Sequence, residues 1–136
     1  MTRKITLSAA KIKLGLQETL TLGDVDAERD WGYARDFVQA MWLMLQQEEA
    51  DDFVLATGKS HSIRELLDIA FQRVGLNWKD HVVESDRFKR PVDPTQLLGD
   101  PTKARDTLGW NSQVDFEQLV HLMVDNDLEL LQDAAR

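Results

Sequence analysis

Three basic side chains could bind a phosphate group, two of them from short loops. Lys4 lies in the first expected helix, Arg29 follows the loop after the first expected strand, and Arg90 lies in a loop stiffened by two prolines. A guanidinium group held on a short loop can bind a phosphate through two parallel hydrogen bonds, which a flexible lysine does less well. Taken alone, each of these residues is more typical of a solvated surface charge.

Other patterns of catalytic or cofactor-binding residues are missing from the sequence. The glycines, at positions 15, 23, 32, 58, 75, 99 and 109, are never closer than eight residues, so no glycine-rich loop can hold a dinucleotide pyrophosphate. His61, His81 and His121 lie 20 and 40 residues apart without carboxylates at ligand spacing, which disfavours a metal site. No serine lies in a G-x-S-x-G elbow. We therefore predict no catalytic residues, no cofactor-binding residues and no bound metal.

Composition narrows the class of protein further. The 136 residues, 43% of them apolar, are enough for one domain with a buried core. The net charge of −8 disfavours a nucleic-acid partner. The absence of cysteine excludes disulfides and thiolate metal sites and suits a reducing compartment. No apolar run approaches the roughly 20 residues that span a bilayer, and the polar start lacks a signal-peptide core, so we expect a cytoplasmic protein without a membrane partner.

The elements that must position the basic residues in the first half of the chain follow from hydrophobic periodicity. Ile5, Ala9, Ile12 and Leu16 recur at helical spacing, which predicts a helix from Thr2 to Leu16. A short strand is expected at 19–22, where β-branched and aliphatic residues alternate. A second helix around 37–45 has a wide apolar face and should be buried against a sheet, and the compact apolar run at 53–57 predicts a buried strand.

Capping residues define the elements of the second half. Ser62 and Glu65 form a capping box that opens a helix running to about Val74. A possible strand follows at 81–83. Asp100 before Pro101 predicts the start of a short helix that Gly109 ends, and Asp115 with Gln118 should cap the last helix.

Several segments, taken in order, closely resemble the carboxyl-terminal half of the GDP-mannose 4,6-dehydratase family. The motif RDWGYA at 29–34, followed by AMWLMLQQ at 40–47, is narrowly specific to this family. The ending, with RP at 90–91, GD at 99–100, KA at 103–104 and LGW at 108–110, is shared by many extended short-chain dehydrogenase/reductase enzymes that act on sugar nucleotides. Further matching segments are 2–6, 22–28, 35–38 and 52–58. The resemblance covers nearly the whole chain.

The resemblance implies an activity whose machinery is mostly missing here. Family members use bound NADP to oxidise the hexose C4, eliminate water across C5 and C6, and return the hydride to C6, giving GDP-4-keto-6-deoxymannose. The glycine-rich cofactor loop and the Tyr-x-x-x-Lys pair lie upstream of the matching region in this family. Tyr33 is the only tyrosine, and Phe37 stands four residues later, so this pair is absent. We therefore expect residues 1–136 to form an α/β GDP-sugar-binding lobe of several helices and short strands, without the Rossmann cofactor domain and inactive alone.

The resemblance also assigns substrate-binding residues. It implies that Lys4 and Arg29 lie near the diphosphate and ribose and that Leu22 and Gly23 lie near the guanine. It implies that Arg90 and Asp93 close over the nucleotide from the other side. Position 93 is often Glu in relatives, and position 24 is often Asn where this chain has Asp24, which weakens the expected contact there.

Several alternatives stay open at the sequence level. Arg29 and Asp30 could form a local ion pair, Asp93 could be a turn residue before Pro94, and Trp31, Trp42 and Trp110 are more typical of packing residues than of stacking platforms. The stripe in the first helix could pack within the lobe or cover an interface. The partners expected are GDP-mannose or GDP, together with a second copy or a cofactor-domain chain in trans. A related sugar-nucleotide reductase or epimerase, or a non-catalytic GDP-sugar-binding or interaction module, is the alternative function.

Overall fold

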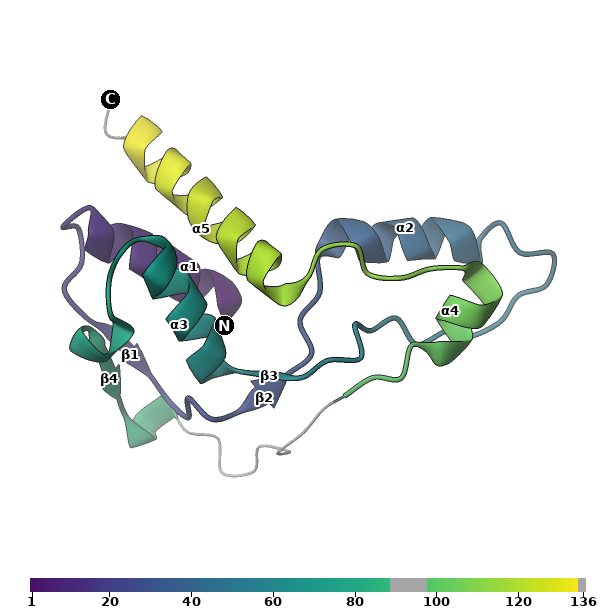
Figure 1. The fold of residues 1–136 in the computed structure, drawn as a ribbon, viewed down its shortest axis with the longest axis horizontal. Helices are drawn as coiled ribbons and strands as arrows, with labels where there is room; N and C mark the ends of the chain where they lie inside the picture. The colour runs from purple at the N-terminus through teal and green to yellow at the C-terminus, as the bar shows by residue number, and fades with distance from the viewer. Residues whose placement is uncertain (89–97, 135–136) are drawn as a thin grey trace. The chain divides into compact units, whose positions relative to one another are not determined.

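A computed structural model describes residues 1–88 and 98–134 (Figure 1). The chain forms two compact units. Unit 1 comprises Met1–Ala27, Ser62–Pro94 and Val120–Arg136, and unit 2 comprises Glu28–His61 and Thr95–Leu119. Both units combine helices with short strands, so the α/β class expected from the sequence is confirmed.

Unit 1 is built around a parallel pair of short strands. β1 (Leu20–Leu22) pairs with β4 (Val82–Glu84), with Leu20 opposite Val82 and Leu22 opposite Glu84. The other elements are α1 (Thr2–Lys13), α3 (Ile63–Arg73), the 3-10 helices η1 (Trp78–Asp80) and η2 (Asp86–Phe88), and α5 (Phe116–Asp133) from Val120 onward. α1 packs against α3. The strands expected at 19–22 and 81–83 are therefore confirmed to within a residue or two.

The apolar stripe of α1 belongs to the core of unit 1. Ile5 and Ala9 are completely buried, and Ile12 is 9% exposed. The helix ends at Lys13, earlier than expected, because Gly15 adopts a left-handed conformation with φ of +71°. Leu16 lies beyond this end and is exposed. Of the two alternatives for the stripe, packing within the lobe is correct for the three helical residues, and an interface role for them is wrong.

The start of α3 follows the predicted capping box. The Ser62 hydroxyl accepts a hydrogen bond from the Glu65 backbone N–H at 3.1 Å, and the Glu65 carboxylate accepts one from the Ser62 N–H at 2.6 Å. Gly75, with φ of +72°, follows the last turn. The expected helix is thus confirmed, with both ends set by the residues that predicted them.

Polar contacts tie α5 to the rest of unit 1. The Asp127 carboxylate, which is 1% exposed, accepts a hydrogen bond from the Thr6 hydroxyl at 2.7 Å and pairs with Arg3 at 3.1 Å. On the same helix, Asp125 accepts two hydrogen bonds from the Arg73 guanidinium at 2.9 and 2.7 Å. These hydrogen bonds lower the pKa of Asp125, with burial opposing them, and they raise the pKa of Arg73.

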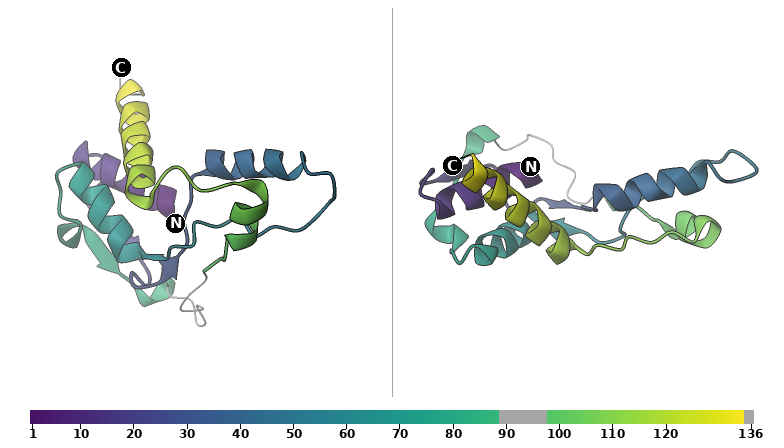
Figure 2. Two further views of the ribbon diagram at one scale, coloured as in Figure 1. Left: turned by 45° about the vertical axis from the view of Figure 1, so that its right-hand side comes forward. Right: turned by 90° about the horizontal axis from the view of Figure 1, so that it is seen from above.

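Unit 2 packs two helices around a small apolar cluster. α2 (Ala34–Met44) contacts α4 (Thr102–Leu108), as Figure 2 shows, and β2 (Glu28–Arg29) pairs with β3 (His61–Ser62). The buried members of the cluster are Ala40, Ala104, Leu108 and Trp110. Partly buried apolar side chains pack around them, namely Phe37, Leu43, Met44, Phe53 and Leu55. We call these nine residues the unit 2 cluster.

A buried carboxylate fixes the loop that leads from α4 to α5. Asp36, only 6% exposed, accepts hydrogen bonds on one oxygen from the Ser112 hydroxyl at 3.3 Å and the Gln113 and Val114 N–H groups at 2.8 and 3.0 Å. The Trp110 indole donates to the Asp36 carbonyl at 2.9 Å. Asp36 is thus the anchor between α2 and residues 110–114.

The caps of α4 and α5 are nearly as expected. The Asp100 carboxylate accepts the Thr102 N–H at 2.9 Å, but the helix begins at Thr102, which makes Pro101 the N-cap rather than the first helical residue. Gly109 ends α4 in the left-handed conformation, with φ of +63°. Asp115 and Gln118 exchange hydrogen bonds at 2.8 and 3.1 Å before α5.

Two expectations for unit 2 were wrong. Residues 53–57 form no strand: none of the described residues pairs with them, and Phe53 and Leu55 belong to the unit 2 cluster instead. The broad apolar face of α2 is not buried against a sheet, since only Asp36 and Ala40 are buried in that helix. Trp42, expected to be a packing residue, is 58% exposed, whereas Trp110 is buried as expected.

Candidate functional site

Three of the predicted substrate-binding residues meet at the carboxyl end of β1. The Lys4 ammonium, on the first turn of α1, donates a hydrogen bond at 2.7 Å to the carbonyl of Thr21, the residue before Leu22. The same ammonium lies 5.0 Å from the centroid of the Phe88 ring. Leu22 is 1% exposed and Gly23 is buried, and the Leu22 carbonyl accepts the Ser85 N–H at 2.8 Å.

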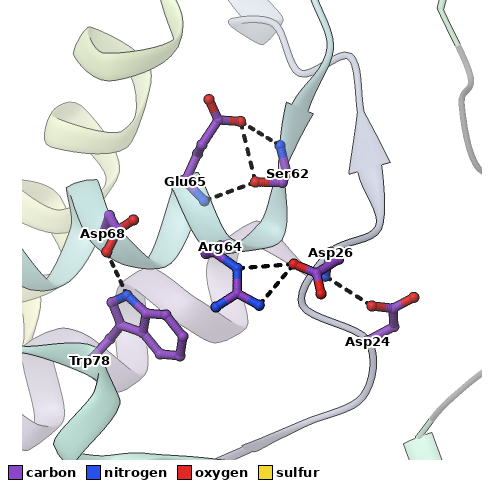
Figure 3. A network of polar contacts seen from close by, with 7 residues as sticks. All are labelled: Asp24, Asp26, Ser62, Arg64, Glu65, Asp68 and Trp78. Carbon is purple, nitrogen blue, oxygen red and sulfur yellow. Dashed lines mark hydrogen bonds and ion pairs between the residues drawn. The ribbon is translucent and has the colours of Figure 1, made fainter.

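The loop that follows β1 is held by several hydrogen bonds, and Figure 3 shows those that join Asp24, Asp26 and Arg64. The Val25 and Ala27 carbonyls accept the Arg64 and Ile63 N–H groups at 2.8 and 3.1 Å, which attaches the loop to the start of α3. The Arg64 guanidinium reaches Asp26 with N–O distances of 2.8 and 2.9 Å and lies 5.6 Å over the Trp78 ring. The loop backbone is therefore held in place before any ligand arrives.

Asp24, where relatives often have Asn, has a local structural role. Its carboxylate accepts the Asp26 N–H at 2.9 Å, which closes a small turn within the loop. An asparagine oxygen could accept the same hydrogen bond, so the exchange preserves the turn. Asp24 is exposed, and Asp26 is paired with Arg64.

The end of β1 suits an anionic ligand. An ammonium group has three donors, and Lys4 gives one of them to Thr21, which leaves two for phosphate oxygens. A fastened loop offers backbone groups at fixed positions, and fixed groups lose little conformational freedom when they bind. The site therefore combines a charge for phosphate with a loop that is held in a fixed conformation.

Arg29 lies in unit 2, on β2. Its guanidinium donates to the Glu28 carbonyl at 2.6 Å, and the residue is half-buried. The next residue, Asp30, is engaged with a turn, because its carboxylate accepts the Thr57 and Gly58 N–H groups at 3.1 and 2.9 Å. The Glu28 carboxylate accepts a hydrogen bond from the Ser60 hydroxyl at 3.0 Å. The backbone on both sides of Arg29 is thus fixed by the segment 57–60.

A stack of three rings lies in unit 2. The Phe116 ring stacks on Trp31, with centroids 5.6 Å apart, and on His61, with centroids 4.0 Å apart. Both pairs are close to parallel, at 12° and 10°. Trp31 is therefore a packing residue, as the sequence suggested.

Arg90 and Asp93, the remaining predicted site residues, lie outside the described residues. Within residues 1–88 and 98–134, no group of three or more metal-ligating side chains is close enough to hold an ion, and no helix there is long and apolar enough to cross a membrane.

Sequence reasoning missed the residues that keep the loops of the candidate site in place. Arg64, whose guanidinium lies over the Trp78 ring, fastens the loop after β1, and Asp30 fastens the turn beside Arg29. The pattern Asp-x-Asp at 24–26 was a usable signal, because an Asp often accepts the N–H two residues later. No comparable local pattern announces the pairing of Arg64 with Asp26, which are 38 residues apart.

The arrangement of helices and short strands is that of part of a known fold. The chain superposes with a TM-score of 0.85 on RMD from Pseudomonas aeruginosa, solved in complex with NADPH, at 21% identity, covering 95% of this chain and 42% of that one. The sequence model described as GDP-mannose 4,6 dehydratase matches residues 1–123. The chain belongs to the GDP-mannose 4,6 dehydratase family.

Curated relatives of the chain carry the same family name. GDP-mannose 4,6 dehydratase 1 of Arabidopsis thaliana is 56% identical over 130 residues, and the human GDP-mannose 4,6 dehydratase is 44% identical over 149 aligned positions. These matches cover 96% and 97% of this chain but only 36% and 40% of the relatives. The 136 residues thus correspond to well under half of the family protein.

Proposed function

We propose that this chain supplies the nucleotide-sugar-binding part of a GDP-mannose 4,6-dehydratase. The observation that carries the proposal is the position of the Lys4 ammonium at the end of β1, next to a loop that is fastened in advance. In this proposal Lys4 and Arg29 lie near the diphosphate and ribose, and Leu22 and Gly23 lie near the guanine. Membership of the family supports the choice of GDP-mannose as ligand.

The reaction assigned to the whole protein is the conversion of GDP-mannose into GDP-4-keto-6-deoxymannose and water. NADP bound to the whole enzyme would take up and return the hydride. The residues described here do not fit that cofactor: the loop after β1 contains one glycine and leads into β2, so no strand, glycine-rich loop and helix follow one another as a dinucleotide site requires. The role of this chain is therefore to bind and orient the nucleotide sugar.

The net charge of the chain affects its affinity for a nucleotide. With a net charge of −8, the protein as a whole repels a nucleotide diphosphate, so affinity depends on local cations at the site. A charge-assisted hydrogen bond to phosphate contributes about 1.5–3 kcal/mol, equivalent to roughly 10- to 150-fold in affinity. Removing Lys4 should therefore weaken GDP binding by about that factor.

Calorimetric titration of GDP into the purified chain tests the proposal. We expect measurable binding that falls at least tenfold in Lys4→Ala. Lys13→Ala is the matched control, because Lys13 is an exposed lysine at the other end of the same helix, and its affinity should equal that of the unchanged chain. Equal affinities for Lys4→Ala and Lys13→Ala would contradict the assignment of Lys4. Absence of GDP binding would contradict the claim that this chain forms the nucleotide site.

A further inference from the structure

An exposed phenylalanine lies beside the lysine to which we assign the diphosphate. Phe88 is 53% exposed, and the centroid of its ring is 5.0 Å from the Lys4 Nζ atom. A cation within about 6 Å of an aromatic ring is attracted by the negative face of the ring. At this distance the attraction is electrostatic, so it uses none of the N–H donors of the ammonium group. A single exposed apolar side chain needs no functional explanation, so the interest of Phe88 lies in its contact with Lys4.

Hydrogen bonds fasten Phe88 to the same strand end that Lys4 reaches. The Ser85 N–H donates to the Leu22 carbonyl at 2.8 Å, and the Phe88 N–H donates to the Ser85 carbonyl at 3.1 Å. β4 ends at Glu84, opposite Leu22, and η2 ends at Phe88. The backbone that carries the ring is therefore attached to the carboxyl end of β1.

Two elements thus hold the Lys4 ammonium besides its own helix. The Thr21 carbonyl on β1 accepts a hydrogen bond from it at 2.7 Å, and the Phe88 ring on η2 attracts its charge. A lysine carries its charge on a flexible four-carbon stem, and fixing such a side chain when a ligand binds costs conformational entropy. An ammonium group that is fixed before the ligand arrives avoids part of this cost.

We propose that Phe88 is a positioning residue for nucleotide binding, and that its ring holds the Lys4 ammonium at the end of β1, ready for the diphosphate. This inference rests on the proposed function, in which Lys4 lies near the diphosphate. The role requires an aromatic ring, because an aliphatic side chain of similar size has no negative face to attract the charge. It requires no contact between the ring and the ligand.

Unit 2 contains a matched pair of a lysine and a phenylalanine. The Lys103 Nζ atom also lies 5.0 Å from the centroid of an aromatic ring, that of Phe53. Like Lys4, Lys103 donates a hydrogen bond to a backbone carbonyl, that of Asp52, at 2.9 Å. The proposed function assigns neither Lys103 nor Phe53 to the nucleotide. Phe53→Leu therefore removes an equivalent contact and keeps an apolar side chain in the unit 2 cluster.

Calorimetric titration of GDP into variants of the 136-residue chain tests the role of the ring. Phe88→Leu should weaken GDP binding by about two- to tenfold, the factor that corresponds to fixing one flexible side chain. Phe88→Tyr keeps the ring and should bind GDP as tightly as the unchanged chain, and so should Phe53→Leu. Since more than half of Phe88 is exposed, both Phe88 variants should unfold at the same urea concentration as the unchanged chain.

Two further measurements show whether the ring acts through Lys4. In a chain that already carries Lys4→Ala, Phe88→Leu should cause no further loss of GDP affinity. A further loss by the same factor would show that the ring acts without Lys4, for example by stacking on the guanine, and would overturn the inference. In NMR spectra of the ligand-free chain, the ε-methylene protons of Lys4 should carry a ring-current shift that Phe88→Leu removes and Phe88→Tyr retains. A shift that persists in Phe88→Leu would overturn the inference as well.

The failure of this inference can be told apart from the failure of the proposed function. Equal GDP affinities of Phe88→Leu and the unchanged chain, together with a loss in Lys4→Ala, would overturn the role of Phe88 and leave the proposed function in place. Absence of GDP binding, or binding that does not depend on Lys4, would overturn both.

Discussion

Replacement of Asp36 by alanine removes the anchor between α2 and the segment 110–114. The Asp36 carboxylate is 6% exposed and accepts three hydrogen bonds on one oxygen, two of them from backbone N–H groups at 2.8 and 3.0 Å. The alanine side chain supplies no acceptor for those two N–H groups. The change therefore removes charge-assisted hydrogen bonds while leaving their donors in place.

The expected cost follows from the number and exposure of these donors. A hydrogen bond to a charged group contributes about 1.5–3 kcal/mol, and a donor left without a partner costs up to a similar amount. Gln113 is exposed, so water can replace part of what its N–H loses, whereas Val114 and Ser112 are half-buried. We expect Asp36→Ala to lower the free energy of unfolding by about 2–4 kcal/mol, and Asp36→Asn, which keeps a neutral acceptor, by about 1–2 kcal/mol.

Urea unfolding followed by tryptophan fluorescence measures this difference, and the buried Trp110, whose indole donates to the Asp36 carbonyl, reports on the same region. Asp106→Ala is the control, because Asp106 is an exposed residue of α4 and its loss should change stability by less than about 0.5 kcal/mol. An unfolding free energy for Asp36→Ala equal to that of Asp106→Ala would refute the anchoring role.

Two further predictions concern unit 1. Ile12→Glu places a charge in the core between α1 and its neighbours and should cost about 3 kcal/mol or more in urea unfolding, whereas an unchanged stability would show that the α1 stripe is not core. The pKa of Asp125 is lowered by Arg73, so this pair stabilises the fold above the pKa of an unfolded aspartate and loses its effect as the pH falls through the lower folded value. The stability difference between the unchanged chain and Arg73→Gln should therefore be full above about pH 5 and shrink below about pH 4, and a difference that grows on acidification would contradict this assignment.

Local signals predicted those elements of the fold that need only their own residues. The capping box of α3, the glycine that ends α4 and the reciprocal cap of α5 are all formed by neighbours in sequence, so their interactions could be inferred directly. The prediction of a strand at 53–57 was wrong because a strand depends on residues outside its own segment. A strand needs a partner, and a pattern that indicates burial cannot show whether the burying surface belongs to the same 136 residues.

The candidate site also contains contacts that the sequence could not predict. The roles of Lys4, Leu22 and Gly23 in ligand binding stay predictions, and the hydrogen bond from Lys4 to Thr21 could not be derived from spacing. Two pairs of residues fasten the site, Arg64 with Asp26 and Asp30 with Gly58. The members of each pair lie far apart in the sequence, so hydrophobic periodicity does not predict their contact. Such contacts depend on the tertiary fold and were found only in the structure.

Conversion of GDP-mannose is the measurement that tests the central claim most directly. The purified chain is incubated with GDP-mannose and NADP, alone and together with a polypeptide comprising the portion of the Arabidopsis thaliana relative that the chain does not match, and the products are identified by mass spectrometry. We predict no conversion by the chain alone, and formation of the 4-keto-6-deoxy product, with loss of one water, by the combined parts. Formation of that product by the 136-residue chain alone would contradict the account, because it would require catalytic and cofactor-binding groups that we do not assign to this sequence.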